Sequence, residues 1–404
     1  MSTAPRPTLQ DIEAAREVLR GVSVLTPMEE SRWLSAAAGG PVLIKAENLQ
    51  RTGSFKIRGA YLRMSRLSAE EKANGVVAAS AGNHAQGVAL AAQMLGIKAT
   101  VFMPDGASIP KEKATRGYGA DVVLGGASID EALVQARAFS AETGAVLIHP
   151  FDHIDIVTGQ GTCGLEIVEQ CHDVRTVLVP CGGGGFLAGI GTAVKALRPE
   201  ARVVGVQAEG AAAYVESLAK GAPVPLSSMT TMADGIAVGC PGQVPFKAVQ
   251  QYVDDFVTVS DDSLSRALLM LLERAKLVVE PAGAAAVAAM LDDPHAFETP
   301  AVVVLSGGNV DPLLMMRVIR KGLAAAGRYL YFRARIPDVP GGLARLLNEL
   351  AAVQANVLDV VHERTSAQLH LDEVEVQLQV ETRGPEHAER VLSRLRDCGY
   401  PLSR

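Results

Sequence analysis

The sequence contains few cysteines, and their arrangement supports neither a disulfide framework nor a zinc site. No two of the five form a CxxC pair, and an odd number cannot pair completely. This use of cysteine is typical of a reduced, cytoplasmic protein, and no metal site is predicted. The five are Cys163, Cys171, Cys181, Cys240 and Cys398.

The chain also lacks an excess of positive charge and an apolar targeting segment. Its net charge is −6, and no Lys/Arg stripe is present, so neither nucleic acid nor an anionic membrane is an expected partner. The N-terminus has no apolar signal core. Residues 176–194 are uncharged but contain Pro180 and six glycines, a break that would leave backbone unpaired in lipid. We therefore predict a strand, a turn and a buried helix there.

Aromatic residues are scarce, at 4%, whereas hydrophobic residues make up 48% of the 404 positions. A chain of this length is expected to form two or three domains. From about residue 40 to 322, short apolar runs alternate with helical patterns, which predicts an α/β fold with a mostly parallel sheet. A TIM barrel shares this alternation, so the motifs must decide between the two. The predicted strands are 41–46, 76–80, 99–103, 121–124, 176–179, 202–206, 256–259 and 301–305, and the predicted helices include 84–95, 129–143, 186–197 and 262–276.

The pattern changes near Gly327. Residues 329–337 are predicted to form a strand, 341–356 a helix, 357–364 a second strand and 385–398 a second helix. Between them, residues 372–382 alternate strictly between apolar and polar positions, as in a half-exposed strand. With a short last strand at 400–402, the order βαββα describes a small ferredoxin-like domain.

The first chemical motif is Gly53-Ser54-Phe55-Lys56, which lies between a predicted strand and a predicted helix. A lysine at a helix N-terminus opposes the helix dipole, so an ordinary surface lysine is poorly placed there. A lysine with a lowered pKa at such a junction can form a Schiff base with an aldehyde cofactor. The alternative is a solvated surface lysine.

The second motif is the polar turn formed by Ser80, Ala81, Gly82, Asn83 and His84, which follows a strand and opens a helix. Its backbone N–H groups can bind a carboxylate, and Asn83 can bond a ring hydroxyl or keto oxygen. The alternative is a turn that only caps the helix.

The third motif is a run of tandem glycines between a strand and a helix, a geometry that suits a phosphate: Gly182, Gly183, Gly184 and Gly185. Gly183, Gly185 and Ala188 also match a relaxed dinucleotide pattern, with Glu209 further on. A dinucleotide-dependent oxidoreductase is therefore an alternative.

The fourth motif is Ser306-Gly307-Gly308-Asn309, at the end of an apolar strand. A serine in this position points into the crevice where open α/β sheets bind ligands, and its hydroxyl could meet a pyridine nitrogen. The four motifs together offer a lysine, a carboxylate site, a phosphate site and a hydroxyl. That set matches an amino acid bound to pyridoxal phosphate.

The motifs GSFKIRGA, SAGNHAQG, CGGGG and VVLSGGN, in this order, resemble the threonine dehydratase (threonine ammonia-lyase) branch of the fold-type-II, tryptophan-synthase-β-like pyridoxal-phosphate enzymes. The resemblance covers about residues 5–322. It implies that Lys56 carries the cofactor, that Phe55 lies against its ring, that Asn83 binds its 3′-oxygen and that Ser306 meets its pyridine nitrogen. The four glycines would hold the phosphate, and the turn from Ser80 to His84 would bind the substrate carboxylate.

The resemblance also predicts the domains and the reaction. A large catalytic domain would comprise residues 1–45 and 146–325, and a small one residues 46–145. Residues 328–404, with DVPGGLARLL in their first loop and helix, resemble an ACT domain, an amino-acid-sensing regulatory module. The expected reaction converts L-threonine to 2-oxobutanoate and ammonia, and L-serine to pyruvate, in isoleucine biosynthesis or threonine catabolism. A branched-chain amino acid, isoleucine first, is the expected effector at the loop 337–342. A homo-oligomer, a dimer or a tetramer, is expected.

Two departures from related enzymes are informative. Serine racemases carry a serine at the position of Ala81, and alanine cannot transfer a proton, so racemisation is disfavoured. Gln207 stands where those relatives place a metal-ligand glutamate, although Glu209 lies nearby. The remaining alternatives are a serine or hydroxyaspartate dehydratase, a threonine or cystathionine synthase, and a catalytically silent amino-acid sensor.

Overall fold

The computed structural model describes residues 6–364, 370 and 372–403; the outer limits of the predicted domain ranges, at 1 and 404, lie outside the described residues. The chain forms two compact units, Met1–Met315 and Met316–Arg404. The division falls inside helix α14 (Pro312–Ala325), ahead of the change of pattern at Gly327.

The first unit contains a six-stranded sheet in the order β1-β2-β10-β7-β8-β9. All neighbouring strands are parallel except β1, which pairs antiparallel with β2. The interior strands are continuous buried runs, as expected for a sheet covered on both faces. The strands are β1 (Met28–Glu30), β2 (Val42–Ala46), β7 (Thr176–Pro180), β8 (Arg202–Ala208), β9 (Asp255–Val259) and β10 (Ala301–Leu305).

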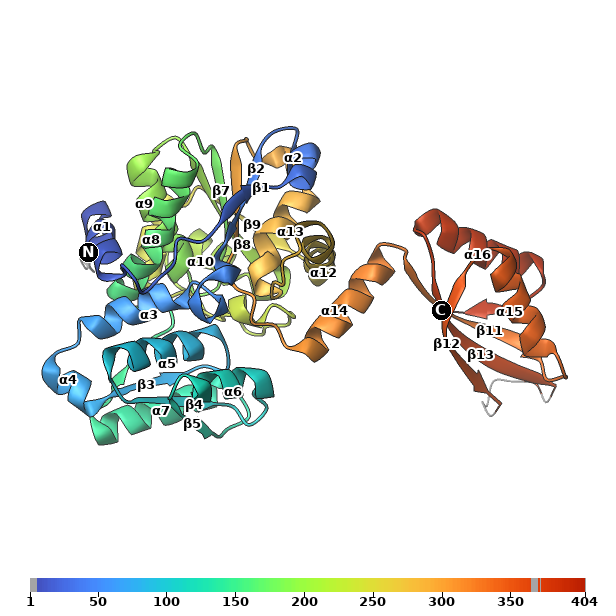
Figure 1. The fold of residues 1–404 in the computed structure, drawn as a ribbon, viewed down its shortest axis with the longest axis horizontal. Helices are drawn as coiled ribbons and strands as arrows, with labels where there is room; N and C mark the ends of the chain where they lie inside the picture. Colours follow the sequence, from blue (N-terminus) through green and yellow to red (C-terminus); the bar gives the residue numbers. More distant parts are fainter. Residues whose placement is uncertain (1–5, 365–369, 371, 404) are drawn as a thin grey trace. The chain divides into compact units, whose positions relative to one another are not determined.

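Helices cover both faces of this sheet. Figure 1 shows α8 and α9 on one side and α12 and α13 on the other. Glycines in α8 and α9 allow the two helices to approach closely, since a Cβ on Gly189 would lie 2.5 Å from the carbonyl oxygen of Val157. The helices are α1 (Leu9–Val18), α2 (Arg32–Ala38), α8 (Ile154–Gln170), α9 (Gly185–Leu197), α10 (Ala213–Lys220), α11 (Gln243–Tyr252), α12 (Asp261–Met270) and α13 (Ala285–Asp292).

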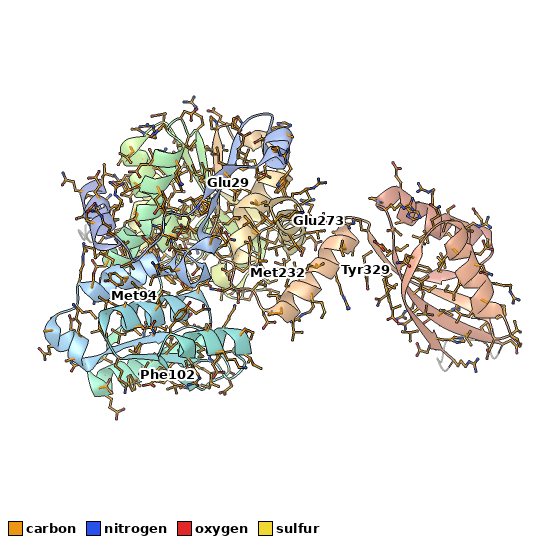
Figure 2. The ribbon with its side chains drawn as sticks, viewed as in Figure 1. Glu29, Met94, Phe102, Met232, Glu273 and Tyr329 are labelled. Atoms are coloured by element: carbon orange, nitrogen blue, oxygen red, sulfur yellow. The ribbon has the colours of Figure 1, made fainter. Side chains whose placement is uncertain are left out.

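A second, parallel sheet has the order β5-β4-β3-β6. Phe102 of β4, labelled in Figure 2, is buried, with its ring centroid 5.6 Å from that of Phe139 in α7. The elements are β3 (Val76–Ala79), β4 (Ala99–Met103), β5 (Asp121–Leu124), β6 (Val146–Leu147), α3 (Lys56–Ser65), α4 (Ala69–Asn74), α5 (Asn83–Leu95), α6 (Ile109–Gly117) and α7 (Ile129–Thr143).

The second unit contains a four-stranded antiparallel sheet in the order β12-β13-β11-β14, the arrangement of a ferredoxin-like βαββαβ fold. One face of β13 is buried through Val374, Val376, Leu378 and Val380, which share a core with leucines of the two helices. The elements are β11 (Tyr329–Pro337), α15 (Gly342–Ala352), β12 (Asn356–Glu363), β13 (Glu373–Glu381), α16 (Pro385–Asp397) and β14 (Leu402–Ser403).

Every strand predicted from the sequence is present, with ends shifted by no more than about two residues, as is usual for element boundaries. The strands form open sheets, so the TIM-barrel alternative is wrong for the described residues. Residues 176–194 form β7, the glycine turn and most of α9. Among the described residues, no helix combines the length and the apolarity that a membrane span requires.

Two strands were not predicted, and two predicted helices need correction. The sequence missed β1 and β6, which have three and two residues and carry no periodic signal. The predicted helix 262–276 changes at Leu271 into a π-helical turn, η5 (Leu271–Ala275), and ends at Lys276, whose φ is 61°. The predicted helix 341–356 ends at Ala352, because Gln354 has a φ of 59° and β12 begins at Asn356.

Short helical turns complete the first unit, and two of them, η4 and η6, contribute residues to the wall of a cavity. The turns are η1 (Glu47–Leu49), η2 (Arg51–Gly53), η3 (Glu209–Ala211), η4 (Asp234–Ile236), η6 (Ala282–Ala284) and η7 (Pro294–Ala296).

Candidate active site

All of the site residues predicted from the sequence line one cavity of about 430 Å³ in the first unit. The strands β3, β7 and β10 end at this cavity, and α3 begins there. Four motifs that are far apart in the sequence are thus brought together, in the region where open α/β sheets bind ligands. The residues are Phe55, Lys56, Ser80, Ala81, Gly82, Asn83, His84, Gly182, Gly183, Gly184, Gly185 and Ser306.

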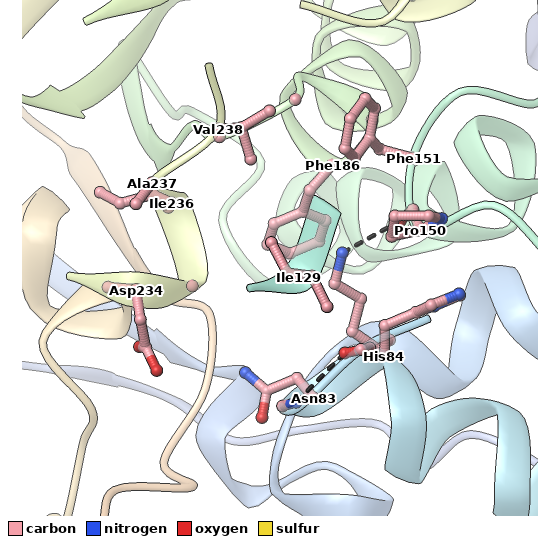
Figure 3. A pocket seen from close by; sticks show the side chains of 18 of the residues that line it. Asn83, His84, Ile129, Pro150, Phe151, Phe186, Asp234, Ile236, Ala237 and Val238 are labelled. Carbon is pink, nitrogen blue, oxygen red and sulfur yellow. Dashed lines mark hydrogen bonds between the residues drawn. The ribbon is translucent and has the colours of Figure 1, made fainter. Parts of the chain in front are cut away.

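Lys56 is the first residue of α3, and its side chain reaches into the cavity. Its Nζ donates a hydrogen bond to the carbonyl oxygen of Pro150 at 3.0 Å, the dashed line beside the Pro150 label in Figure 3. Burial lowers the pKa of Lys56 to about 8, although the Glu280 carboxylate opposes this shift. A large fraction of the amine is therefore neutral and nucleophilic near pH 8.

Backbone contacts between two motifs position Lys56. Ser54 and Gly307 form an isolated antiparallel bridge, and the Phe55 N–H donates to the carbonyl oxygen of Ser306 at 3.4 Å. The Phe55 ring stacks on Phe186 of α9, with ring centroids 3.8 Å apart and planes 8° from parallel. The residue that precedes the lysine is thus held between α3 and α9.

The turn that follows β3 is closed by a hydrogen bond from the Gly82 N–H to the Ser80 hydroxyl oxygen at 3.1 Å. Its backbone then opens α5 at Asn83. The His84 Nε2 lies 2.7 Å from the carbonyl oxygen of Ile148, which can only accept, so Nε2 carries the proton. Burial lowers the pKa of His84 to about 3, so the ring is neutral.

Glycine is required in the tandem-glycine turn. A Cβ on Gly183 would lie 2.4 Å from the Phe151 ring, and one on Gly184, whose φ is 96°, would lie 1.8 Å from the Tyr214 hydroxyl oxygen. The turn leads directly into the 13-residue helix α9. Bare backbone at a helix N-terminus favours a bound phosphate, and here it faces the same cavity as Lys56.

Ser306 lies directly after β10, and it is only 5% exposed. Its position places a hydroxyl on the cavity wall, in the same chain segment that forms a bridge with the residues before Lys56. A buried hydroxyl that faces a cavity is available to bond a ligand.

Comparison with known proteins agrees with this geometry. A family model described as pyridoxal-phosphate dependent enzyme matches residues 22–307.

The chain belongs to this family.

The L-threonine ammonia-lyase of Thermotoga maritima is 44% identical over 395 residues, which covers 98% of this chain and 98% of that protein. A solved threonine deaminase, from T.th., is 43% identical with a TM-score of 0.72, and the match covers 76% of this chain and 99% of that one. Maize serine racemase is 34% identical with a TM-score of 0.74, covering 79% and 99%. The expected cofactor, pyridoxal phosphate, and the fold-type-II catalytic core are confirmed.

The cavity is also lined by charged and titratable residues that the sequence motifs did not include: Lys111, His149, Asp234 and Glu280. Burial raises the pKa of Glu280 to about 7, with Asp234 raising it further. Lys111 of α6 donates to Asp234 at 3.0 Å. His149 accepts the Asp152 N–H on Nδ1 at 2.8 Å, and burial lowers its pKa to about 4. His149 is therefore a neutral ring beside Pro150.

These residues carried only weak sequence signals. His149 comes shortly after the two-residue strand β6, which the sequence did not predict. Glu280 precedes Pro281 in a stretch without regular structure, so periodicity could not identify it.

Gln207, which stands where related enzymes place a metal-ligand glutamate, has a hydrogen-bond partner within the protein. The Gln207 side chain is fully buried, and its Oε1 accepts the Tyr214 N–H at 3.0 Å. Within the described part of the chain, no three His, Cys, Asp or Glu side chains group together as metal ligands would.

Proposed function

We propose that this protein is an L-threonine ammonia-lyase that converts L-threonine to 2-oxobutanoate and ammonia, and L-serine to pyruvate. The observation that carries the proposal is the buried amine of Lys56 in the cavity that the glycine turn, the Ser80 turn and Ser306 share. The names of the 44%-identical relative and the 43%-identical solved structure support the choice of threonine.

The residues present fit pyridoxal phosphate. Lys56 would hold the cofactor aldehyde, and Gly182 to Gly185 would bind the phosphate through backbone N–H groups. Asn83 would bond the ring oxygen, and Ser306 the ring nitrogen. The fit rests on the glycine turn, where side chains on Gly183 and Gly184 would collide with neighbouring rings, so that bare backbone faces the cavity. When bound, the cofactor supplies an electron sink for negative charge that develops on the substrate's α-carbon.

The chain's own residues would bind the substrate and move its proton. The turn from Ser80 to His84, which leads into α5 at Asn83, would present backbone N–H groups to the substrate carboxylate. His84 contributes no positive charge there, since its ring is neutral and bonded to Ile148. The Lys56 amine, with its pKa lowered to about 8, would remove the α-proton as general base.

Ala81 argues against racemisation as the main activity. It lines the cavity within the carboxylate-binding turn, where a methyl group can neither donate nor accept a proton. Proton transfer would then be confined to the face of the substrate that Lys56 occupies.

A keto-acid assay across L-threonine, L-serine and their D-forms tests the proposal. We expect 2-oxobutanoate from L-threonine, pyruvate from L-serine, and no D-serine formed from L-serine at a rate comparable with pyruvate formation. Absence of keto acid from both L-amino acids, with cofactor bound, would contradict the proposed activity and favour a silent amino-acid sensor.

The second unit is proposed to be an ACT-like regulatory domain that binds a branched-chain amino acid, isoleucine first. A cavity of about 530 Å³ lies beside the loop between β11 and α15. Gly341, with a φ of 82°, precedes α15, and Arg364 lies 3.3 Å from Asp338 at this cavity. The helix N-terminus suits a carboxylate, and the apolar lining suits an aliphatic side chain.

The regulatory proposal is tested by titration of isoleucine and valine against the full-length protein and a truncation after Gly327. We expect a roughly 5–150-fold shift in apparent threonine affinity for the full chain and none for the truncation. If neither amino acid binds at millimolar levels, the unit serves dimerisation instead.

A cytoplasmic homo-oligomer, a dimer or a tetramer, is proposed, and light scattering will measure its mass.

A further inference from the structure

We propose that Glu280 is a positioning residue that, with Asn309, fixes the side-chain amide of Asn83 so that one N–H of Asn83 is directed into the cavity. The inference rests on the proposed function, in which Asn83 bonds the cofactor's ring oxygen. It adds a residue and a direction of hydrogen bonding that the sequence motifs do not contain.

The order of donors and acceptors fixes the orientation of both amides. Asn309 Nδ2 lies 2.6 Å from the backbone oxygen of Thr52 and 2.7 Å from Asn83 Oδ1. A backbone carbonyl can only accept, so the Asn309 atom that meets Thr52 must be the nitrogen. That nitrogen donates its two hydrogens to Thr52 and Asn83. The Asn83 atom that accepts must therefore be the oxygen.

The other end of the Asn83 amide meets Glu280. Asn83 Nδ2 donates to Glu280 Oε1 at 2.5 Å. An amide nitrogen carries two hydrogens, so one N–H remains for a ligand. Asn83 lines the cavity, and its side chain is labelled in Figure 3. With its oxygen held by Asn309 and one hydrogen by Glu280, the amide cannot flip without breaking both bonds.

Three backbone features make room for this network. A Cβ on Gly307 would lie 2.2 Å from Glu280 Oε1 and 2.9 Å from Asn83 Nδ2. A Cβ on Gly53 would lie 2.6 Å from Asn309 Oδ1. Thr52 adopts a φ of 64°, which is rare for a β-branched residue. A glycine of the lysine motif and a glycine of the serine motif thus accommodate the side chains that hold Asn83.

Glu280 itself is 3% exposed, and its backbone N–H donates to the Gly307 carbonyl oxygen at 3.1 Å. Burial and Asp234 raise its pKa to about 7, while Lys111, the Asn83 bond and Lys56 act in the opposite direction. A protonated carboxyl keeps a carbonyl oxygen that accepts. The bond to Asn83 can therefore persist in both protonation states, and a glutamine can replace it.

The test measures the dissociation constant of pyridoxal phosphate from the full-length protein by cofactor titration of the cofactor-free form. Glu280→Ala should weaken binding about tenfold, since Asn83 then loses the acceptor that orients it. Glu280→Gln, which restores an acceptor, should stay within about threefold of the wild type. Asn48→Ala is the matched control, because Asn48 is a buried asparagine that bonds Val278 and does not line the cavity.

A double-mutant cycle separates positioning from an independent effect. If Glu280 acts through Asn83, the Glu280→Ala, Asn83→Ala double variant should bind no more than about threefold more weakly than Asn83→Ala alone. Losses that multiply would overturn the inference, as would a Glu280→Gln loss equal to that of Glu280→Ala. If Asn83→Ala binds the cofactor as tightly as the wild type does, Asn83 does not bond the cofactor's ring oxygen, and this inference is wrong. A normal threonine ammonia-lyase rate in that variant would leave the proposed reaction standing.

Discussion

Two regions of buried charge each include a residue of α3, and they differ in how their charges are paired. Arg58 is fully buried and bonds Glu47 at 2.8 Å and Glu166 at 2.6 Å, and Glu166 also binds Lys45 at 2.7 Å. Two residues earlier in the chain, Lys56 donates a hydrogen bond to the backbone carbonyl of Pro150, and no ion pair joins it to a carboxylate among the described residues.

The titration of the two regions follows from this pairing. Burial alone would raise the pKa of Glu47, but Arg58 and Lys45 hold it below its ordinary value. Burial alone would lower the pKa of Arg58, but Glu47 and Glu166 raise it well above. In the cavity burial dominates. It lowers the pKa of Lys56 to about 8 and raises the pKa of Glu280 to about 7. Buried charges with full partners keep their charged forms, whereas buried groups with few partners have pKa values shifted toward neutral pH and are available for chemistry.

Lys56→Ala should have the largest effect of these variants, and it should act on activity and not on the fold. Loss of the general base alone should reduce turnover by roughly 10²–10⁴-fold, and loss of the cofactor attachment should reduce it further. The folded structure should persist, because within the part of the chain that the structure describes Lys56 forms no ion pair with a carboxylate, and Glu280 acts on it only as a nearby charge. Keto-acid assays and thermal unfolding measure both effects. A variant with a tenth of wild-type turnover would contradict the assignment.

Arg58→Met, in contrast, should mainly lower the stability of the folded protein. It leaves Glu47 and Glu166 buried without their main partner, which should cost about 3–5 kcal/mol of the free energy of unfolding. Urea unfolding measures this cost. Arg16→Met is the matched control, because the pair Arg16–Glu169 is about half exposed and should contribute about 0–1 kcal/mol. Equal effects of the two variants would show that burial of the Arg58 network has no special role.

Ser306→Ala sharpens the comparison on the cavity side. Loss of one hydrogen bond to a buried ring nitrogen should weaken cofactor binding by about 1–3 kcal/mol, with little change in the unfolding of the cofactor-free protein. Cofactor titration and thermal unfolding separate the two quantities. Wild-type affinity in this variant would make Ser306 a turn residue only.

The lowered pKa of Lys56 predicts a smaller effect of pH. The neutral amine is the nucleophile, and its fraction falls about tenfold per pH unit well below the pKa. Cofactor uptake by the cofactor-free protein should therefore rise with pH and level off above about pH 8. Stopped-flow absorbance measures the rate. A rate that keeps rising to pH 10 would show that Lys56 has its ordinary pKa.

Much of the fold could be predicted from the sequence because its signals are local. Parallel strands such as β10 are continuous apolar runs, and helices such as α16 have a clear apolar face at helical spacing. The site residues in glycine-rich turns could be predicted because those turns follow strands. Glu280 and Arg58 could not, since their roles depend on partners distant in sequence. Glu280 meets Asn83, and Arg58 meets Glu166, only after folding.

The most direct test of the central claim is to identify the lysine that carries the cofactor. Borohydride reduction of the cofactor-loaded wild-type protein, followed by peptide mass spectrometry, should place the phosphopyridoxyl group on Lys56 alone. The same treatment of Lys56→Ala should yield no modified lysine. A cofactor adduct on another lysine of the wild-type protein, or an unmodified Lys56 in a protein that turns over threonine, would contradict the account.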